Sequence, residues 1–197
     1  MNTVKTLETG SPKFVQIVEI ASELFRKYGV KRVTVEEICT TAQISKMTFY
    51  KYFANKIELA EYIIFKILEE AQSEFERIFD QSGSFTEKID QFIQMKLKYA
   101  KQFSKEFYLD FMNLSPAIHD KINSYAINNH AQFIQIMEQA QKTGDVRKDI
   151  SIKFISFMLN KVLELREDAE LLSQFNDLEE MTMDMINFYF YGIMGKK

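Results

Sequence analysis

Residues 44–59, ISKMTFYKYFANKIEL, decide the fold of this chain. The first ten hold two lysines, two tyrosines and two phenylalanines, and Asn55 then begins a new helix, with a glutamate three residues later. On a helical wheel the rings that can pack inward share one side: Phe49, Tyr52 and Phe53. Another side collects Lys46, Met47, Tyr50 and Lys51. We therefore predict a short helix that packs by its aromatic side and presents its lysines to solvent.

Two more helices precede this one. The segment KFVQIVEIASELFRKYGV, residues 13–30, repeats apolar residues every three or four positions and meets a helix stop at Gly29. Thr34, with a glutamate three residues later, has the spacing of a capping box and begins a short second helix. The chain must then turn at 42–44 before Ser45 caps the next helix. Two short helices joined by a three-residue turn are a helix-turn-helix.

The composition favours an all-α protein. The 197 residues are 46% hydrophobic and 27% charged, and 6 Gly with 2 Pro are too few breakers for a many-stranded fold. The single cysteine, Cys39, supplies neither an internal disulfide framework nor a multi-thiolate metal site, which is typical of a reducing cytoplasm. The first residues lack the apolar stretch of a signal peptide, and no apolar run reaches about 18 residues. We expect a cytoplasmic protein that does not enter the membrane.

Charge is distributed unevenly. Residues 1–60 carry nine Lys or Arg against six Asp or Glu, a net charge of +3, whereas residues 61–197 carry a net charge of −6. The net charge of −3 argues against nucleic-acid binding only when the charge is averaged over the whole chain. On the outward side of the 44–53 helix, lysines can bind phosphate oxygens or guanine edges, a tyrosine hydroxyl can hold a phosphate, and methionine can make apolar contacts in the major groove. The alternative is an ordinary solvated surface.

Beyond residue 55 the pattern predicts a larger helical body. A long helix should run from Asn55 until Gly83 breaks it. Further helices are expected over 86–113, 117–142, 151–174 and 177–194. Ser84 and Asn176, paired with Glu87 and Glu179, have the spacing of capping boxes. We place a helix-turn-helix domain at 1–54 and a helical body at 55–197.

The last of these helices is apolar on nearly every side, so more than one face needs to be covered. Its length of about 17 residues, with Asp184 inside, makes it a poor membrane span. The body can cover one face, and a second copy of the chain can cover the other across a two-fold axis. The alternative is a central helix in a monomeric core.

The stretch from Ala21 to Leu59 resembles, over its whole length, the N-terminal DNA-binding region of the TetR family of transcriptional repressors. The elements of the family pattern are Leu24-Phe25, Gly29, Thr34, Ile38, Ser45, Thr48, Tyr50, Phe53 and Asn55-Lys56. Two positions depart from it, because Gln43 in the turn and Met47 in the third helix stand where relatives often have Gly. The resemblance implies a three-helix head that binds double-stranded DNA.

The same resemblance implies individual roles for the head residues. Phosphate contacts would come from Thr34, Ser45, Tyr50 and Lys56. The residues nearest the bases would be Lys46, Met47 and Thr48, and Lys51 completes the outward side of the helix. The resemblance also implies a homodimer, paired through the C-terminal helices, that is released from a palindromic operator by a small ligand.

Two polar residues interrupt apolar stripes of the body helices, namely Lys96 and His130. Such groups are costly unless they are paired or solvated. We predict an aromatic-lined pocket with these two groups as anchors, suited to a hydrophobic anion such as a lipid-like acid. Its lining residues would be Phe92, Lys96, Tyr99, Phe103, Phe107, His130, Phe133 and Met137. The alternative is that Lys96 extends to solvent and His130 forms a core hydrogen bond.

The sequence gives little support to catalysis. It has no HExxH, no phosphate-binding glycine pattern and no GxSxG. His119 and His130 would lie about 16 Å apart on one helix, too far to share a metal ion. We expect no enzyme, cofactor or metal. The competing function is that of a DNA-bound interaction protein whose body recruits a protein partner and binds no small ligand.

Overall fold

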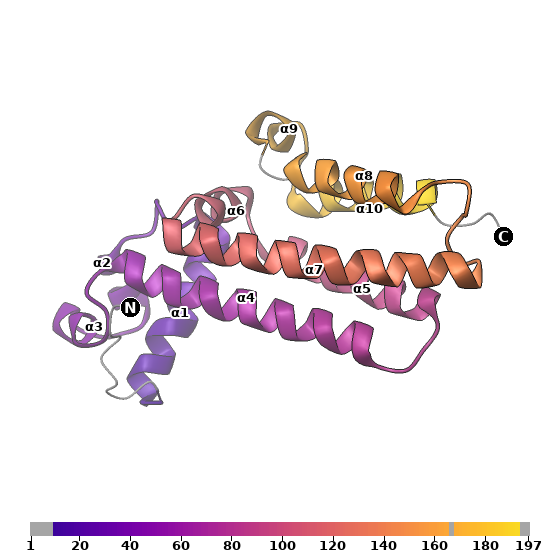
Figure 1. Cartoon of the computed structure of the whole chain (residues 1–197). Coiled ribbons are helices and arrows are strands. Elements are labelled where there is room, and N and C mark those ends of the chain that lie inside the picture. Colours follow the sequence, from indigo (N-terminus) through magenta and orange to yellow (C-terminus); the bar gives the residue numbers. More distant parts are fainter. Residues whose placement is uncertain (1–9, 166–167, 194–197) are drawn as a thin grey trace. The chain divides into compact units, whose positions relative to one another are not determined.

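Every regular element is an α-helix in residues 10–165 and 168–193, which are the residues that the structure, a computed structural model, describes (Figure 1). The helices are α1 Pro12–Tyr28, α2 Val35–Thr41, α3 Lys46–Tyr52, α4 Lys56–Asp80, α5 Phe85–Gln102, α6 Lys105–Met112, α7 Pro116–Thr143, α8 Ile152–Leu165, α9 Ala169–Ser173 and α10 Leu178–Ile193. The all-α prediction is confirmed.

Packing divides the chain into two compact units. Among the described residues, the head unit joins 10–69 with 102–119, and the body unit joins 70–101 with 120–165 and 168–193. Helix α6 therefore belongs to the head unit, and α4 and α7 each contribute residues to both units. This division by packing differs from the domains expected from sequence, 1–54 and 55–197, which stay a prediction.

Buried aromatic rings form the centre of the head unit. The rings of Phe14 and Phe53 stack with their centres 5.4 Å apart, and the centre of the Phe49 ring lies 6.0 Å from that of Phe53. All three side chains are buried. Tyr52 is half-buried, and its hydroxyl shares a 2.9 Å hydrogen bond with Oγ of Ser11, the cap of α1. The aromatic side of α3 is packed, as the wheel predicts.

Side-chain caps fix where the two helices of the motif begin. Thr34 Oγ1 accepts a 3.1 Å hydrogen bond from the Glu37 N–H at the start of α2, and Ser45 Oγ accepts one of the same length from the Thr48 N–H at the start of α3. Between the helices, Gln43 has a left-handed backbone with φ of 50°. Both predicted starts and the short turn between them are confirmed.

Two predicted helices are each divided in the structure. The segment 86–113 forms α5 and α6, because Ser104 caps a new helix by accepting the Phe107 N–H at 3.1 Å. The segment 151–174 forms α8 and α9, and Asp168 caps α9. The wheel missed both breaks because the apolar spacing continues through them. Residues 166, 167 and 194, which fall in predicted helices, lie outside the described residues.

The capping box at Ser84 is confirmed, since the Ser84 N–H donates to Glu87 at 2.8 Å and the Glu87 N–H donates to Ser84 Oγ at 3.3 Å. The predicted box of Asn176 with Glu179 is wrong by one residue. The cap of α10 is Asp177, which accepts the Glu180 N–H at 2.8 Å, and the Glu180 carboxylate accepts the Asn176 N–H at 2.9 Å. Sequence spacing alone allows either register, because residues 176 and 177 are both good caps.

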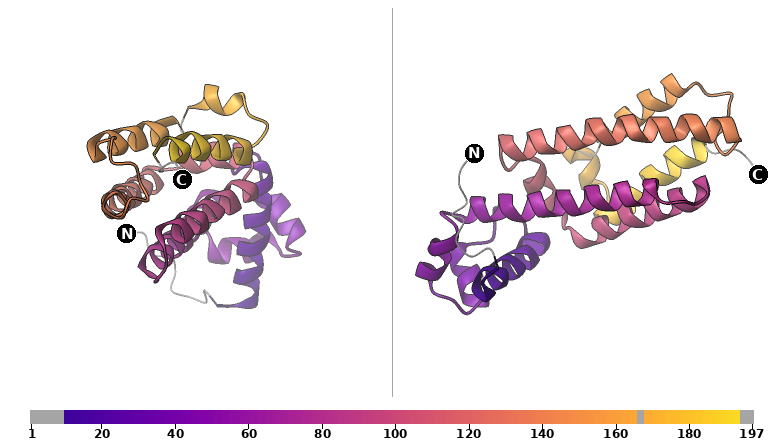
Figure 2. Two further views of the ribbon diagram at one scale, coloured as in Figure 1. Left: turned by 90° about the vertical axis from the view of Figure 1, so that its right-hand side faces the viewer. Right: turned by 60° about the horizontal axis from the view of Figure 1, so that its bottom comes forward.

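A second aromatic core fills the body unit. Rings from four of its helices follow one another with centres 4.9–6.3 Å apart: Phe75, Phe79, Phe92, Phe133 and Phe190. Helices α8 and α10 lie side by side in this unit (Figures 1 and 2), and the Tyr189 hydroxyl donates to the Ile155 carbonyl at 3.3 Å. Burial raises the pKa of the Tyr189 phenol.

We predict that Gln43→Gly stabilises the protein by about 0.5–1 kcal/mol. A left-handed conformation costs a residue with a Cβ about 1–2 kcal/mol, and the larger unfolded-state entropy of glycine offsets about 0.5–1 kcal/mol of that gain. Urea denaturation followed by circular dichroism measures the change. Gln43→Val is the control and should destabilise, because β-branched residues fit a positive φ poorly. Equal stability of the two variants would contradict this account of the turn.

Candidate nucleic-acid interface

The outward side of α3 is formed by side chains that the fold leaves in solvent. Met47 is 84% exposed and Tyr50 is 53% exposed, and Lys46 and Lys51 are also exposed, whereas Phe49 between them is buried. A seven-residue helix cannot persist alone, so burial of one side is what holds the other side in place. The structure thus brings together the predicted α3 residues on one surface.

Ser45 and Thr48 lie at the N-terminus of α3, and their side-chain oxygens are 2.9 Å apart. Ser45 is exposed and Thr48 is half-buried. Thr34 is exposed at the start of α2. Each hydroxyl that caps a helix keeps lone-pair and O–H capacity beyond the capping bond, so capping does not prevent a contact to a phosphate oxygen.

Lys46 is paired with a residue that sequence reasoning missed. Its ammonium lies 2.6 Å from the carboxylate of Glu36 in α2, with both side chains more than half exposed. The hydrogen bond and the charge of Lys46 lower the pKa of Glu36, and those of Glu36 raise the pKa of Lys46. The sequence shows that Glu36 and Lys46 carry opposite charges ten residues apart, but only the helix-turn-helix geometry brings the two side chains together.

Lys56, a predicted phosphate contact, is half-buried and already engaged by the protein. Its ammonium donates to the backbone carbonyls of Lys31 at 3.0 Å and Val33 at 2.7 Å. Both carbonyls belong to the segment between α1 and α2. Elsewhere on this segment, the guanidinium of Arg32 lies 4.4 Å from the centre of the Tyr28 ring.

The eight predicted ligand-binding residues are divided between the two units. Phe103 and Phe107 belong to the head unit, where their ring centres are 5.1 Å apart and the Arg26 guanidinium lies 5.4 Å from the Phe103 ring. The other six belong to the body unit: Phe92, Lys96, Tyr99, His130, Phe133 and Met137. Phe92 and Phe133 meet with ring centres 5.6 Å apart, and Met137 is fully buried.

Lys96 is exposed, and its ammonium lies 5.1 Å from the centre of the Phe92 ring. His130 Nε2 forms a 2.9 Å hydrogen bond with Ser156 Oγ of α8. Both observations fit the simpler alternative for these two residues. However, His130 Nδ1, Asn129 Oδ1 and Gln72 Oε1 are buried and meet no hydrogen-bond partner among the described residues. All three atoms lie in the body unit, on α4 and α7.

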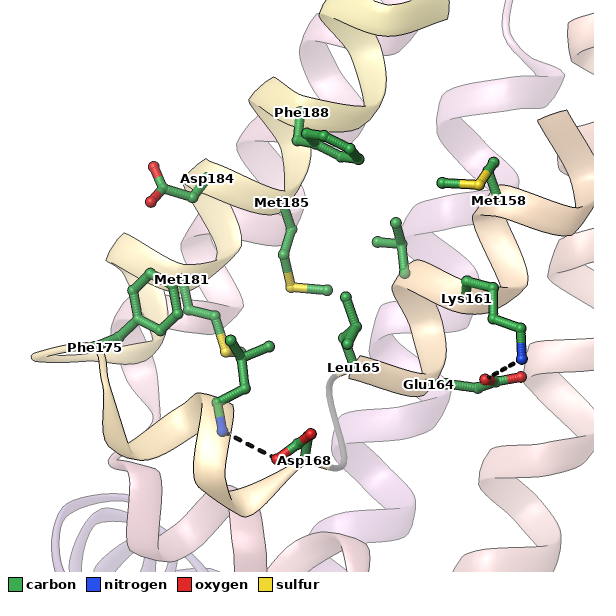
Figure 3. A pocket seen from close by; sticks show the side chains of 12 residues that line it. Met158, Lys161, Glu164, Leu165, Asp168, Phe175, Met181, Asp184, Met185 and Phe188 are labelled. Atoms are coloured by element: carbon green, nitrogen blue, oxygen red, sulfur yellow. Dashed lines mark hydrogen bonds and ion pairs between the residues drawn. The ribbon is translucent and has the colours of Figure 1, made fainter.

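An open groove of about 510 Å³ runs between α8, α9 and α10. Figure 3 shows Met185 pointing toward Leu165 across it, with Met158 and Phe188 at one end and Phe175 near the other. Charged side chains border these apolar groups: Lys161, Glu164, Asp168 and Asp184. The groove was not expected from sequence, because it depends on the break between α8 and α9.

No helix within the described residues is long and apolar enough to cross a membrane. Nor do those residues bring together three His, Cys, Asp or Glu side chains that could hold a metal ion. Cys39 is buried, and burial raises the pKa of its thiol, which makes it a packing residue of α2.

Comparison with known proteins places the head in a family. The model of the bacterial regulatory proteins of the tetR family matches residues 17–63. An HTH-type transcriptional regulator of Staphylococcus aureus is 26% identical over 175 residues, which are 88% of this chain and 90% of that protein. The matched region contains the whole of α2 and α3 together with the start of α4.

Solved structures share the fold of the whole chain. SmeT, the repressor of the Stenotrophomonas maltophilia multidrug efflux pump SmeDEF, superposes with a TM-score of 0.64 at 18% identity, covering 96% of this chain and 93% of SmeT. A regulator from Saccharomonospora viridis, solved in complex with choline, superposes with a TM-score of 0.70 at 15% identity, covering 92% and 97% of the two chains. Its helix-turn-helix and the family match over residues 17–63 identify the head as that of the TetR family and the chain as a DNA-binding transcriptional regulator.

Proposed function

We propose that this regulator is a homodimeric repressor that binds a palindromic operator and leaves it when a small hydrophobic ligand binds the body unit. The observation that carries the DNA-binding part is the outward side of α3, on which Lys46, Met47 and Tyr50 stand exposed around a buried Phe49. The dimer and the ligand rest on separate features of the body unit.

The outward side of α3 suits the major groove. Phosphate contacts from Thr34, Ser45, Tyr50 and Lys51 position the head but carry no sequence information. Base edges then face Lys46, Met47 and Thr48. A lysine can donate to guanine, and the apolar Met47 side chain suits a thymine methyl group. Glu36 limits this readout, since it holds the Lys46 ammonium and adds a negative charge beside the DNA backbone.

A second copy of the chain would cover the apolar residues that α8 and α10 expose: Phe154, Phe157, Phe188 and Tyr191. Exposed apolar side chains of this size, if they meet in one patch, mark an interaction site. The groove between these helices also carries both signs of charge, so Lys161 of one copy can meet Asp184 of the other in a self-complementary interface. A dimer then sets two α3 helices on two half-sites of one operator.

A ligand for the body unit is supported by its buried polar atoms. Among the described residues Gln72 Oε1, Asn129 Oδ1 and His130 Nδ1 meet no hydrogen-bond partner, and a buried polar group without a partner is costly. SmeT has been solved as a complex with triclosan, and the Saccharomonospora viridis regulator with choline. We infer a hydrophobic ligand with an acid group near Lys96 and a hydrogen-bonding group near His130.

The second candidate function is a DNA-bound protein that recruits a protein partner. Two observations favour it: the rings of the body core contact one another directly, and the groove between α8, α9 and α10 is open and apolar. A homodimer accounts for the groove as well. Competition between a second copy and a foreign partner for the same surface therefore separates the two functions.

We predict a dimer at micromolar concentration and a bound DNA sequence with dyad symmetry. Phe188→Asp should weaken the dimer at least about tenfold, because it places a charge in an apolar interface. Ile127→Asp is a matched control, since Ile127 on α7 is 70% exposed and Phe188 is 71% exposed. Sedimentation and random-library selection of bound DNA measure these outcomes. A monomeric wild type, or selected sites without symmetry, would sink the dimer proposal.

We predict that Glu36→Gln tightens binding to all DNA sequences by about three- to tenfold and steepens the log–log salt dependence by about 0.9, because the Lys46 charge, no longer paired with Glu36, then offsets one more phosphate charge from its place in the groove. Glu37→Gln removes the same charge one residue along and leaves the Glu36–Lys46 pair in place. Lys46→Ala should instead change the selected bases, and Tyr50→Phe should weaken binding to all sequences alike. Identical salt dependence for Glu36→Gln and Glu37→Gln would show that the pair does not restrain Lys46.

We predict that acidic hydrophobic compounds release the DNA and raise the thermal midpoint, and that Lys96→Met weakens this response about tenfold, within the usual range of allosteric coupling. Lys98→Met is the control, because Lys98 is on the same helix but pairs with Glu74 at 2.8 Å. A panel of acidic, neutral and cationic hydrophobic compounds tests which chemical class of ligand releases the DNA. Release by cationic compounds alone, or an unchanged response of Lys96→Met, would reject the assignment.

A further inference from the structure

The connector between α1 and α2, residues 29–33, is held from two sides by side chains of other helices. We propose that Asp110 of α6 and Lys56 of α4 form a clamp on this connector, so that Asp110 is a positioning residue for DNA binding. On this proposal Lys56 acts through the connector and not as a phosphate ligand. The proposal rests on the DNA-binding function and adds residues to it from outside the helix-turn-helix.

Asp110 holds the connector from one side. Its side chain is the one charged group that is buried among the described residues. Its Oδ2 accepts the Lys31 N–H at 2.8 Å, and its Oδ1 lies 3.1 Å from the Lys31 ammonium. Burial of a carboxylate is costly unless its oxygens are paired. The two contacts to Lys31 supply this pairing for Asp110.

Close packing fixes the same side. Gly29 has φ of 81°, and a Cβ added to it would lie 2.9 Å from Asp110 Oδ2 and 3.1 Å from the Glu106 Cβ. The connector therefore approaches α6 as closely as glycine permits. Ser104, the N-cap of α6, is bonded to α1 as well, because its N–H donates to the Arg26 carbonyl at 2.9 Å. Helix α6 is thus fastened to both the end of α1 and the connector.

Lys56 holds the connector from the other side. Two of the three donors of its ammonium are used by the carbonyls of Lys31 and Val33. Lys31 is consequently gripped at both ends of its backbone, by Asp110 through its N–H and by Lys56 through its C=O. The next residue after Val33 is Thr34, the cap of α2. The clamp therefore sets the position at which α2, and with it α3, begins.

The two roles of Lys56 predict different salt dependence. Loss of a phosphate contact lowers the slope of log affinity against log salt by about 0.9. Loss of a clamp misplaces the head, which lowers affinity at every salt concentration and leaves the slope unchanged. Residues that act through one structural element are also non-additive, whereas an independent phosphate contact and a clamp residue should add.

The test is a double-mutant cycle on DNA affinity with Lys56→Met, Asp110→Asn and the double variant, each measured over a salt series at a temperature where circular dichroism shows it folded. We expect each single change to weaken binding about five- to tenfold with an unchanged slope. The double variant should lose no more affinity than the single variant that binds DNA less tightly. Asp110→Ala extends the series, because Asn keeps an acceptor for the Lys31 N–H and Ala does not. The expected order of affinity is wild type, Asn, Ala.

Lys66→Met is the matched control, since it removes the same charge from α4 at an exposed position ten residues on. Amide exchange at Lys31 should quicken in the Asp110 variants ahead of the rest of the head. A slope that falls by about 0.9 in Lys56→Met, together with additive effects, overturns the clamp. A wild-type protein that selects no DNA at all refutes the proposed function instead, so the two failures are distinct.

Discussion

Burial of the Phe49 ring is the interaction on which the outward side of α3 depends. Helix α3 has seven residues, fewer than an isolated helix needs to persist in water. Phe49 has no exposed surface, and Phe53 and Phe14 complete the stack beneath it. Because one side of so short a helix is fixed by aromatic packing, the positions of Met47 and Tyr50 on the other side follow from it. The Ser45 cap fixes where α3 begins, and so determines which residues face inward and which face outward.

The cations of the head differ in how freely they can serve DNA. Lys51 is exposed at the end of α3, where its ammonium lies 5.8 Å from the centre of the Tyr52 ring, and Lys46 shares its charge with Glu36 at the surface. Exposed pairs of this kind are weak and screened by salt, so a phosphate can compete for Lys46. Lys56 is half-buried and donates to the backbone carbonyls of Lys31 and Val33. The same residue type therefore lies at the surface at one position and is bonded within the protein at another.

The body unit combines a core of touching rings with helices that remain apolar on the outside. Phe133 meets Phe79, Phe92 and Phe190 in the interior. Outside it, Phe188 and Tyr191 of α10 stand in solvent although α10 also buries Tyr189 and Phe190. A helix that is apolar all round cannot be satisfied by one neighbour, which is the physical reason to infer a second copy against α8 and α10.

The sequence by itself determined the helical class, the helix-turn-helix and most helix starts, because these depend on contacts three or four residues apart. Thr34, Ser45 and Ser84 cap the helices that their spacing predicts, and the apolar period placed Phe49 inside and Met47 outside. The tertiary structure decided what joins distant segments. Asp110 meets Lys31 across 79 residues and Lys56 meets Lys31 across 25, while Ser104 and Asp168 cap new helices at points where the apolar pattern continues. Spacing carries no information about such pairs, since a side chain finds its distant partner only when packing has closed the chain around it.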